Sequence, residues 1–83
     1  MYRVVLPKRV EKSLRNLPAK EQMRVIQALE GLQDDPLAGK NLKGTLEGIY
    51  SIRVWPLRIL YEIRRKERDV LILFIGHRKD AYK

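Results

Sequence analysis

The spacing of apolar residues constrains this chain more than any other feature, because it changes from a helical period to a period of two near residue 49. Upstream of that point, apolar residues recur every three or four positions in residues 8–17 and again in residues 18–33. These spacings predict two amphipathic helices, one ending near Asn16 and one stopped by the DDP segment at 34–36. With so short a connection the helices should form an antiparallel hairpin, and neither can bury its apolar stripe alone.

Strand-like segments predict the surface on which this hairpin packs. Residues 2–6, 49–55 and 57–64 read as strands, and residues 70–75 are apolar on both faces, as expected for an interior strand. The intervening residues 37–48 contain three glycines and predict a loop, held over the core by Leu37, Leu42 and Leu46. The sequence therefore predicts an α+β fold of order β-α-α-β-β-β, a single domain over residues 1–83. Its helical hairpin should pack on one face of a small antiparallel sheet and leave the other face open.

Composition restricts the kinds of partner and location. The 83 residues include 18 Lys and Arg against 10 Asp and Glu, a formal net charge of +8, which favours an anionic partner such as nucleic acid or an acidic protein. The absence of cysteine excludes disulfides and cysteine metal sites, and it fits a reducing compartment, so we expect the cytoplasm. The apolar run at the N-terminus is too short to cross a membrane, and we expect no membrane partner.

Two arginines should meet on the open face. Closure of a hairpin at Trp55-Pro56 places Arg53 directly opposite Arg58, and the same register pairs Ile52 with Ile59 on the core face. Like charges in directly opposed positions destabilise a strand pair, so folding gains nothing from this arrangement. An anion bound between the two guanidinium groups would explain it. The alternative is two solvated arginines that splay apart.

The segment IGHRKDAYK, residues 75–83, adds charge and an aromatic ring after the last strand. Gly76 allows the backbone to redirect Arg78 and Tyr82 toward the open face, where arginines and a tyrosine suit a phosphodiester and an unpaired base. The alternative is a basic terminus whose tyrosine packs on the sheet. His77 is the only histidine and a candidate general acid or base, although its parity also fits a structural role. No metal-ligand spacing is present.

The segments NLKGTLEGIYSIRVWPLRILYEI, residues 41–63, and IGHRKDAY, residues 75–82, together with the order of elements, resemble the RelE/ParE toxin superfamily. The resemblance is to its RelE-like mRNA interferases and spans nearly the whole chain. It implies a toxin that enters the ribosomal A site and cuts mRNA there without a cofactor. The 2′-OH of the message attacks the adjacent phosphate, which leaves a 2′,3′-cyclic phosphate and a 5′-OH.

The resemblance also implies roles for individual residues. Arg53 matches a basic catalytic residue, Arg58 a phosphate-binding arginine, and Arg78 and Tyr82 the arginine and tyrosine that follow the last strand. Arg53 stands where relatives carry a lysine proposed as base, and arginine, with a pKa above ~12, is a poor general base. Proton transfer then belongs to His77 or Tyr82, or catalysis relies on positioning and electrostatics.

Four further residues are predicted to contact RNA: Lys43, Ser51, Lys79 and Lys83. Ser51 stands where better-known bacterial relatives carry a further lysine. The implied partners are the 70S-type ribosome with its mRNA and a cognate antitoxin, whose acidic or amphipathic segment would fold over the basic face. Two other readings stay open, a ParE-like inhibitor of DNA gyrase that acts by binding, and a decayed toxin that serves as a partner-binding module.

Overall fold

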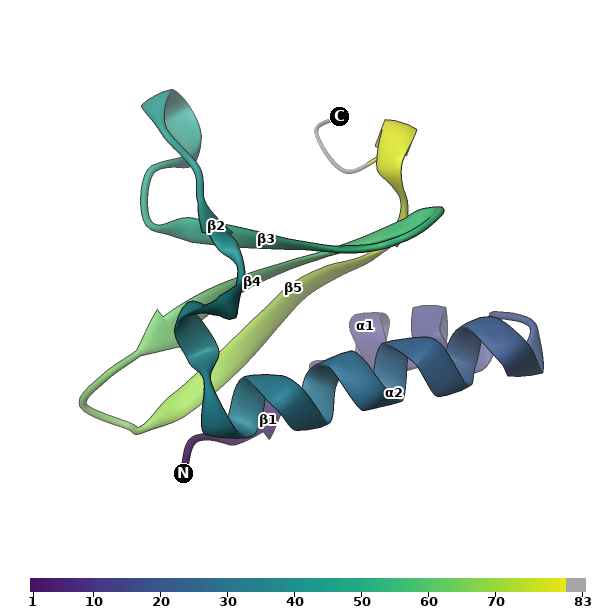
Figure 1. Cartoon of the computed structure of the whole chain (residues 1–83), viewed down its shortest axis with the longest axis horizontal. Helices are drawn as coiled ribbons and strands as arrows, with labels where there is room; N and C mark the ends of the chain where they lie inside the picture. The colour runs from purple at the N-terminus through teal and green to yellow at the C-terminus, as the bar shows by residue number, and fades with distance from the viewer. Residues whose placement is uncertain (81–83) are drawn as a thin grey trace.

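The computed structural model describes residues 1–80 and contains a helical hairpin packed against a twisted sheet (Figure 1). The elements in chain order are β1 (Arg3–Val5), α1 (Lys8–Arg15), α2 (Ala19–Asp34), η1 (Pro36–Ala38), β2 (Lys40–Asn41), η2 (Gly44–Leu46), β3 (Ile49–Val54), β4 (Leu57–Arg64), β5 (Asp69–His77) and η3 (Arg78–Asp80), where η marks a 3₁₀ turn. Both helices lie on one side of the sheet, and η3 lies on the opposite side. The predicted α+β class and the helical hairpin on one face are confirmed.

The sheet is mixed, which corrects the expectation of a purely antiparallel one. Its strand order is β1-β5-β4-β3-β2, and β1 runs parallel to β5 with Val4 opposite Val70. The local sequence pattern indicates only which consecutive strands form hairpins, whereas the pairing of β1 with β5 joins opposite ends of the chain. The predicted loop over residues 37–48 also contains β2, which pairs with β3 and adds a fifth strand.

The core lies between the helices and one face of the sheet. Val10 and Leu14 of α1 and three residues of α2 are buried against β4 and β5. These two strands contribute the core side chains Leu57, Ile59, Tyr61, Val70, Ile72 and Ile75. At the helical turn, the side-chain amide of Gln22 donates hydrogen bonds to the carbonyls of Arg15 and Leu17, at 2.9 and 3.1 Å. The first bond satisfies a carbonyl that the end of α1 leaves without a helical partner, and the second holds the connection between the helices.

Tyr61 fixes the segment that leads into β2. Its hydroxyl donates to the carbonyl of Pro36 at 2.7 Å and accepts from the N–H of Gly39 at 2.9 Å, while its ring stacks on Tyr50 at 5.5 Å. Burial raises the pKa of the phenol above its ordinary value of 10.0, so the donated proton stays in place at neutral pH. Leu37, one of three leucines expected to hold this segment, is instead exposed.

A buried carboxylate ties the far end of the sheet together. Asp69 is 1% exposed and accepts two hydrogen bonds from the guanidinium of Arg64, at 2.7 and 2.8 Å, with Arg3 at 3.8 Å. The hydrogen bonds from Arg64 lower the pKa of Asp69. Since Arg3, Asp69 and Arg64 belong to β1, β5 and β4, one carboxylate links three strands.

Asp69 should make the protein acid-sensitive. A carboxyl group with a lowered folded pKa contributes stability above its ordinary pKa of about 4, and this contribution is lost as the pH falls through the folded value. We therefore expect Asp69→Asn to be less stable than wild type at pH 7 and to lose less stability on acidification to pH 3. Urea unfolding at both pH values measures this, with Asp34→Asn as the exposed control. Equal acid sensitivity of Asp69→Asn and wild type would contradict the assignment.

Candidate functional site

The predicted pair of arginines is present on the sheet face opposite the helices. Arg53 of β3 is directly opposite Arg58 of β4, and the same register pairs Ile52 with Ile59, as predicted. Arg53 is exposed and Arg58 is half-buried. The register prediction is therefore confirmed, and it places two arginines on adjacent strands of the open face.

Arg58 is held in place by a neighbouring hydroxyl. Its Nη1 donates a hydrogen bond of 3.0 Å to Oγ of Ser51, which lies two positions before Arg53 on the same face of β3. Ser51 is only 5% exposed. The residue predicted to contact RNA therefore lies beneath the surface and contacts the arginine.

The ring of Phe74 adjoins this site, and the sequence analysis did not predict it there. Gly76 of β5 is paired with Arg58, and a Cβ atom at Gly76 would lie 2.7 Å from the ring of Phe74. The ring therefore occupies the space beside the glycine. Phe74 and Gly76 share a face because they are two positions apart on one strand. That spacing is visible in the sequence, but the apolar pattern predicts residues 70–75 to be core on both faces.

The remaining predicted residues that the structure describes lie in β5, in η3 and just before η2. His77 is exposed and is paired with the core residue Leu57, so its parity puts it on the helix side of the sheet, away from Arg53 and Arg58. Arg78 begins η3, two residues after Gly76, and Lys79 is exposed in the same turn. Lys43 is exposed just before η2. Tyr82 and Lys83 lie outside the described residues.

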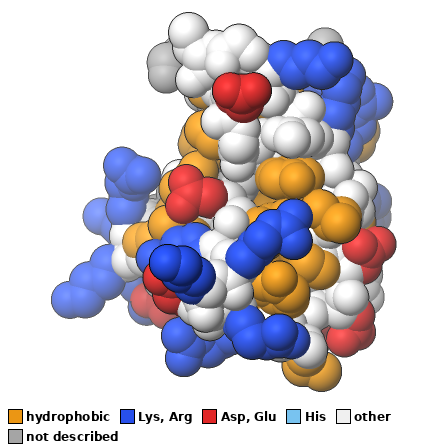
Figure 2. Space-filling model, turned by 90° about the vertical axis from the view of Figure 1, so that its left-hand side faces the viewer, with side chains coloured by type: hydrophobic (Ala, Val, Ile, Leu, Met, Phe, Trp, Pro, Cys, Tyr) orange, Lys and Arg blue, Asp and Glu red, His pale blue; other side chains and the backbone are white. Residues whose placement is uncertain are grey.

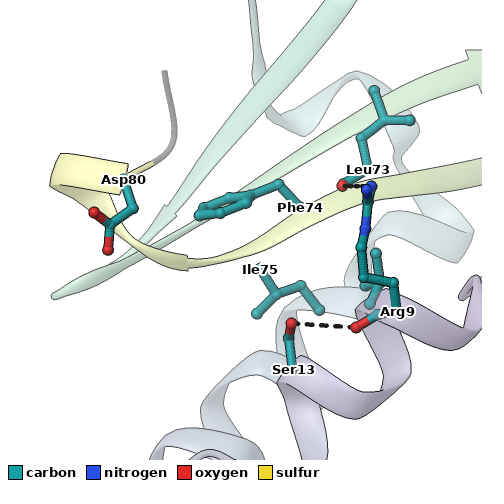
Figure 3. Close-up of a pocket in the computed structure, with 7 residues that line it drawn as sticks. Arg9, Ser13, Leu73, Phe74, Ile75 and Asp80 are labelled. Atoms are coloured by element: carbon teal, nitrogen blue, oxygen red, sulfur yellow. Dashed lines mark hydrogen bonds between the residues drawn. The ribbon is translucent and has the colours of Figure 1, made fainter. Parts of the chain in front are cut away.

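The Phe74 ring also lines a pocket of about 370 Å³ between α1, β5 and η3 (Figure 3). Arg9 and Ser13 come from α1 and Asp80 from η3. The Arg9 guanidinium donates to the carbonyl of Leu73 at 3.5 Å, and Leu73 is the residue of β5 that has no partner on β4. This bulge lies between the core residue Ile72 and the site residue Phe74, where it resets which side chains face the site.

Basic side chains extend well beyond the arginine pair. Figure 2 looks onto the end of the molecule that carries the β4–β5 hairpin, where Lys and Arg side chains, with Asp and Glu side chains among them, border a band of hydrophobic ones. The hairpin connection contributes exposed Arg65, Lys66 and Arg68. Such a surface attracts polyanions over a wide area.

Within residues 1–80, no three His, Cys, Asp or Glu side chains are grouped so that they could hold a metal ion. None of the helices in the same range has the length and hydropathy required to cross a membrane. What the site does provide is a pair of cross-strand guanidinium groups, a hydroxyl that orients one of them, and an aromatic ring beside them.

The described residues form a small basic α+β domain with paired arginines on its open sheet face, and comparison with known proteins identifies the family to which the chain belongs. The family model described as the ParE toxin of the type II toxin-antitoxin system, parDE, matches residues 4–82. Toxin RelG of Mycobacterium tuberculosis is 33% identical over 84 residues, covering 99% of this chain and 97% of that protein.

Solved structures of toxins share the fold of this chain. The toxin of the RelBE2 toxin-antitoxin complex from M. tuberculosis superposes with a TM-score of 0.84 and 32% identity, covering 93% of this chain and 98% of that one. The archaeal RelE-RelB complex from Pyrococcus horikoshii gives a TM-score of 0.81 and 28% identity, covering 96% and 98%. The chain belongs to the RelE/ParE toxin superfamily and is a toxin of a type II toxin-antitoxin system.

Proposed function

We propose that this toxin is a ribosome-dependent endoribonuclease that cleaves mRNA in the A site of a 70S-type ribosome and so inhibits translation in the cytoplasm. The observation that carries the proposal is the cross-strand pair of Arg53 and Arg58 on the open face, with Arg58 anchored to Ser51. Two adjacent cations stabilise the additional negative charge that a phosphodiester acquires as it becomes pentacoordinate.

The proposed reaction needs no metal and no cofactor. The 2′-oxygen forms a bond to the adjacent phosphorus and the bond from phosphorus to the 5′-oxygen breaks, giving a 2′,3′-cyclic phosphate and a 5′-OH. The 2′-OH loses a proton and the leaving 5′-oxygen gains one, so the overall reaction neither consumes nor releases protons. Arg53, Arg58 and Arg78 supply electrostatic stabilisation, and Tyr82 is the first candidate for proton transfer. His77, with its parity toward the helix side, is the second.

Contacts with RNA outside the reacting phosphate are assigned to three lysines. Lys43 precedes η2 and Lys79 lies in η3, both exposed, and Lys83 follows outside the described residues. A cognate antitoxin is the second proposed partner. RelB, which is named in the complexes of both structural relatives, suggests its class, and the net charge of +8 favours an acidic segment that covers the basic face.

Primer extension on a defined mRNA in a purified translation system tests the nuclease. We expect cuts at A-site codons when wild-type protein and ribosomes are both present, and intact message in the ribosome-free control. The product ends should carry a cyclic phosphate and a 5′-OH. Intact message with ribosomes present would overturn the proposal.

The second candidate is inhibition of DNA gyrase by binding, which the ParE description of the matching family model favours. A supercoiling assay with purified gyrase in parallel distinguishes the two. Gyrase inhibition with intact message would establish this alternative, whereas inactivity in both assays would point to a decayed toxin that retains a partner-binding surface.

A further inference from the structure

Arg58 does not project straight across the sheet toward its register partner. Its partner on β3 is Arg53, yet its Nη1 donates to Ser51, which is opposite Leu60 and therefore one diagonal step along the strand. The guanidinium is thus drawn away from the like charge of Arg53. This diagonal contact reduces the electrostatic repulsion between two arginines in directly opposed positions.

The Ser51 hydroxyl is well placed to hold that orientation. Ser51 is 5% exposed and is flanked by Lys40 of β2 and Leu60 of β4, of which Leu60 is 6% exposed. A buried hydroxyl requires a hydrogen-bond partner, and a charged donor forms a stronger bond than a neutral one. Because the guanidinium is planar and rigid, fixing one of its N–H groups sets the direction of the others.

We propose that Ser51 is a positioning residue of the cleavage site, which acts through Arg58 and makes no contact with RNA itself. Its hydroxyl fixes the Arg58 guanidinium in the orientation that meets the scissile phosphate and keeps it apart from Arg53. This inference rests on the proposed nuclease function. It assigns to Ser51 a role in place of the direct RNA contact that the sequence predicted.

The kinetic test measures single-turnover cleavage of ribosome-bound mRNA. We expect Ser51→Ala to lower the maximal rate constant by about 10- to 100-fold, with a change of less than about threefold in the half-saturating toxin concentration, because orientation affects the transition state most. Ser51→Thr keeps the hydroxyl and should stay within about threefold of wild type. Ser13→Ala, which removes a hydroxyl that donates to the Arg9 carbonyl within α1, is the matched control.

A double-mutant cycle shows whether Ser51 acts through Arg58. In an Arg58→Lys background the planar guanidinium is absent, so Ser51→Ala should change the rate by less than about twofold. An equal loss in both backgrounds would overturn the proposal, because Ser51 would then act on something else. Thermal unfolding of every variant separates loss of fold from loss of orientation.

A side-chain NMR readout keeps this inference distinct from the nuclease proposal. The ¹⁵N resonances of the Arg58 guanidinium, assigned by their loss in Arg58→Lys, should report hindered rotation in wild type and Ser51→Thr and faster rotation in Ser51→Ala. Unchanged rotation in Ser51→Ala would overturn the role of Ser51. Failure of wild type to cleave mRNA would instead overturn the nuclease proposal, while the NMR result would still show whether Ser51 orders Arg58.

Discussion

Arg58→Ala is expected to reduce the rate of mRNA cleavage on the ribosome by about 10²–10³-fold, the effect typical of removing one preorganised group that stabilises developing negative charge. Arg58 is half-buried and anchored to Ser51 at 3.0 Å, so its guanidinium requires little reorganisation when the phosphate arrives. Arg53 is exposed, and Arg53→Ala should cost less, about 10-fold. Single-turnover primer extension at saturating toxin measures both rates.

The matched control is Arg15→Ala. Arg15 is an exposed arginine of α1 whose contact is with Glu11 at 3.7 Å, and it lies on the helix side of the sheet. This variant removes the same charge from the protein and should cleave within about twofold of wild type. If Arg15→Ala and Arg58→Ala lose the same activity, net charge alone explains the loss and the assigned site is wrong.

Gly39→Ala is expected to destabilise the fold by about 2 kcal/mol, which lowers the midpoint of thermal unfolding by roughly 10 °C in a domain of this size. A Cβ atom at position 39 would lie 2.5 Å from the Tyr61 hydroxyl and 2.9 Å from the carbonyl oxygen of Ser51. The Ser51 oxygen is backbone and the Tyr61 hydroxyl is bonded to the Pro36 carbonyl, so neither can move aside at a small energetic cost. Urea and thermal unfolding followed by circular dichroism measure the loss.

Gly31 provides a control of the same chemistry. It lies within α2, and a Cβ atom there meets nothing within 4 Å, so Gly31→Ala should stabilise the protein by up to about 1 kcal/mol. In a Tyr61→Phe background the hydroxyl is gone, and Gly39→Ala should cost less than it does in wild type. A neutral Gly39→Ala, or an equal cost in both backgrounds, would show that the hydroxyl does not enforce glycine at this position.

Period and hairpin closure predicted the parts of the molecule that are local in sequence. The stripes of both helices and the two-residue turn after Val54 required only neighbouring residues, and the turn fixed Arg53 opposite Arg58. Features that depend on contacts between distant segments were not predicted. The parallel pairing of β1 with β5 and the pairing of β2 with β3 depend on where distant segments meet, and the extra residue at Leu73 breaks the alternation on which the reading of β5 relied.

The candidate site was predictable in its residues more than in its contacts. Arg53 and Arg58 were found because the period of two places them on the open face. The burial of Ser51 was not predicted, because a serine between charged and apolar neighbours in a strand gives no indication of its exposure. The Phe74 ring was hidden for a related reason, since an aromatic residue within an apolar strand reads as core.

The parallel pairing of β1 with β5 has a consequence for how the protein acquires its activity. The bond from the N–H of Arg3 to the carbonyl of Arg68, and the carboxylate of Asp69 that joins three strands, connect segments separated by almost the whole chain. Contacts of such high sequence separation form late, because the chain between them must first be ordered. A truncated product that ends before Asp69 would lack both the strand that supports the helices and the glycine opposite Arg58, so interrupted synthesis should yield a harmless fragment.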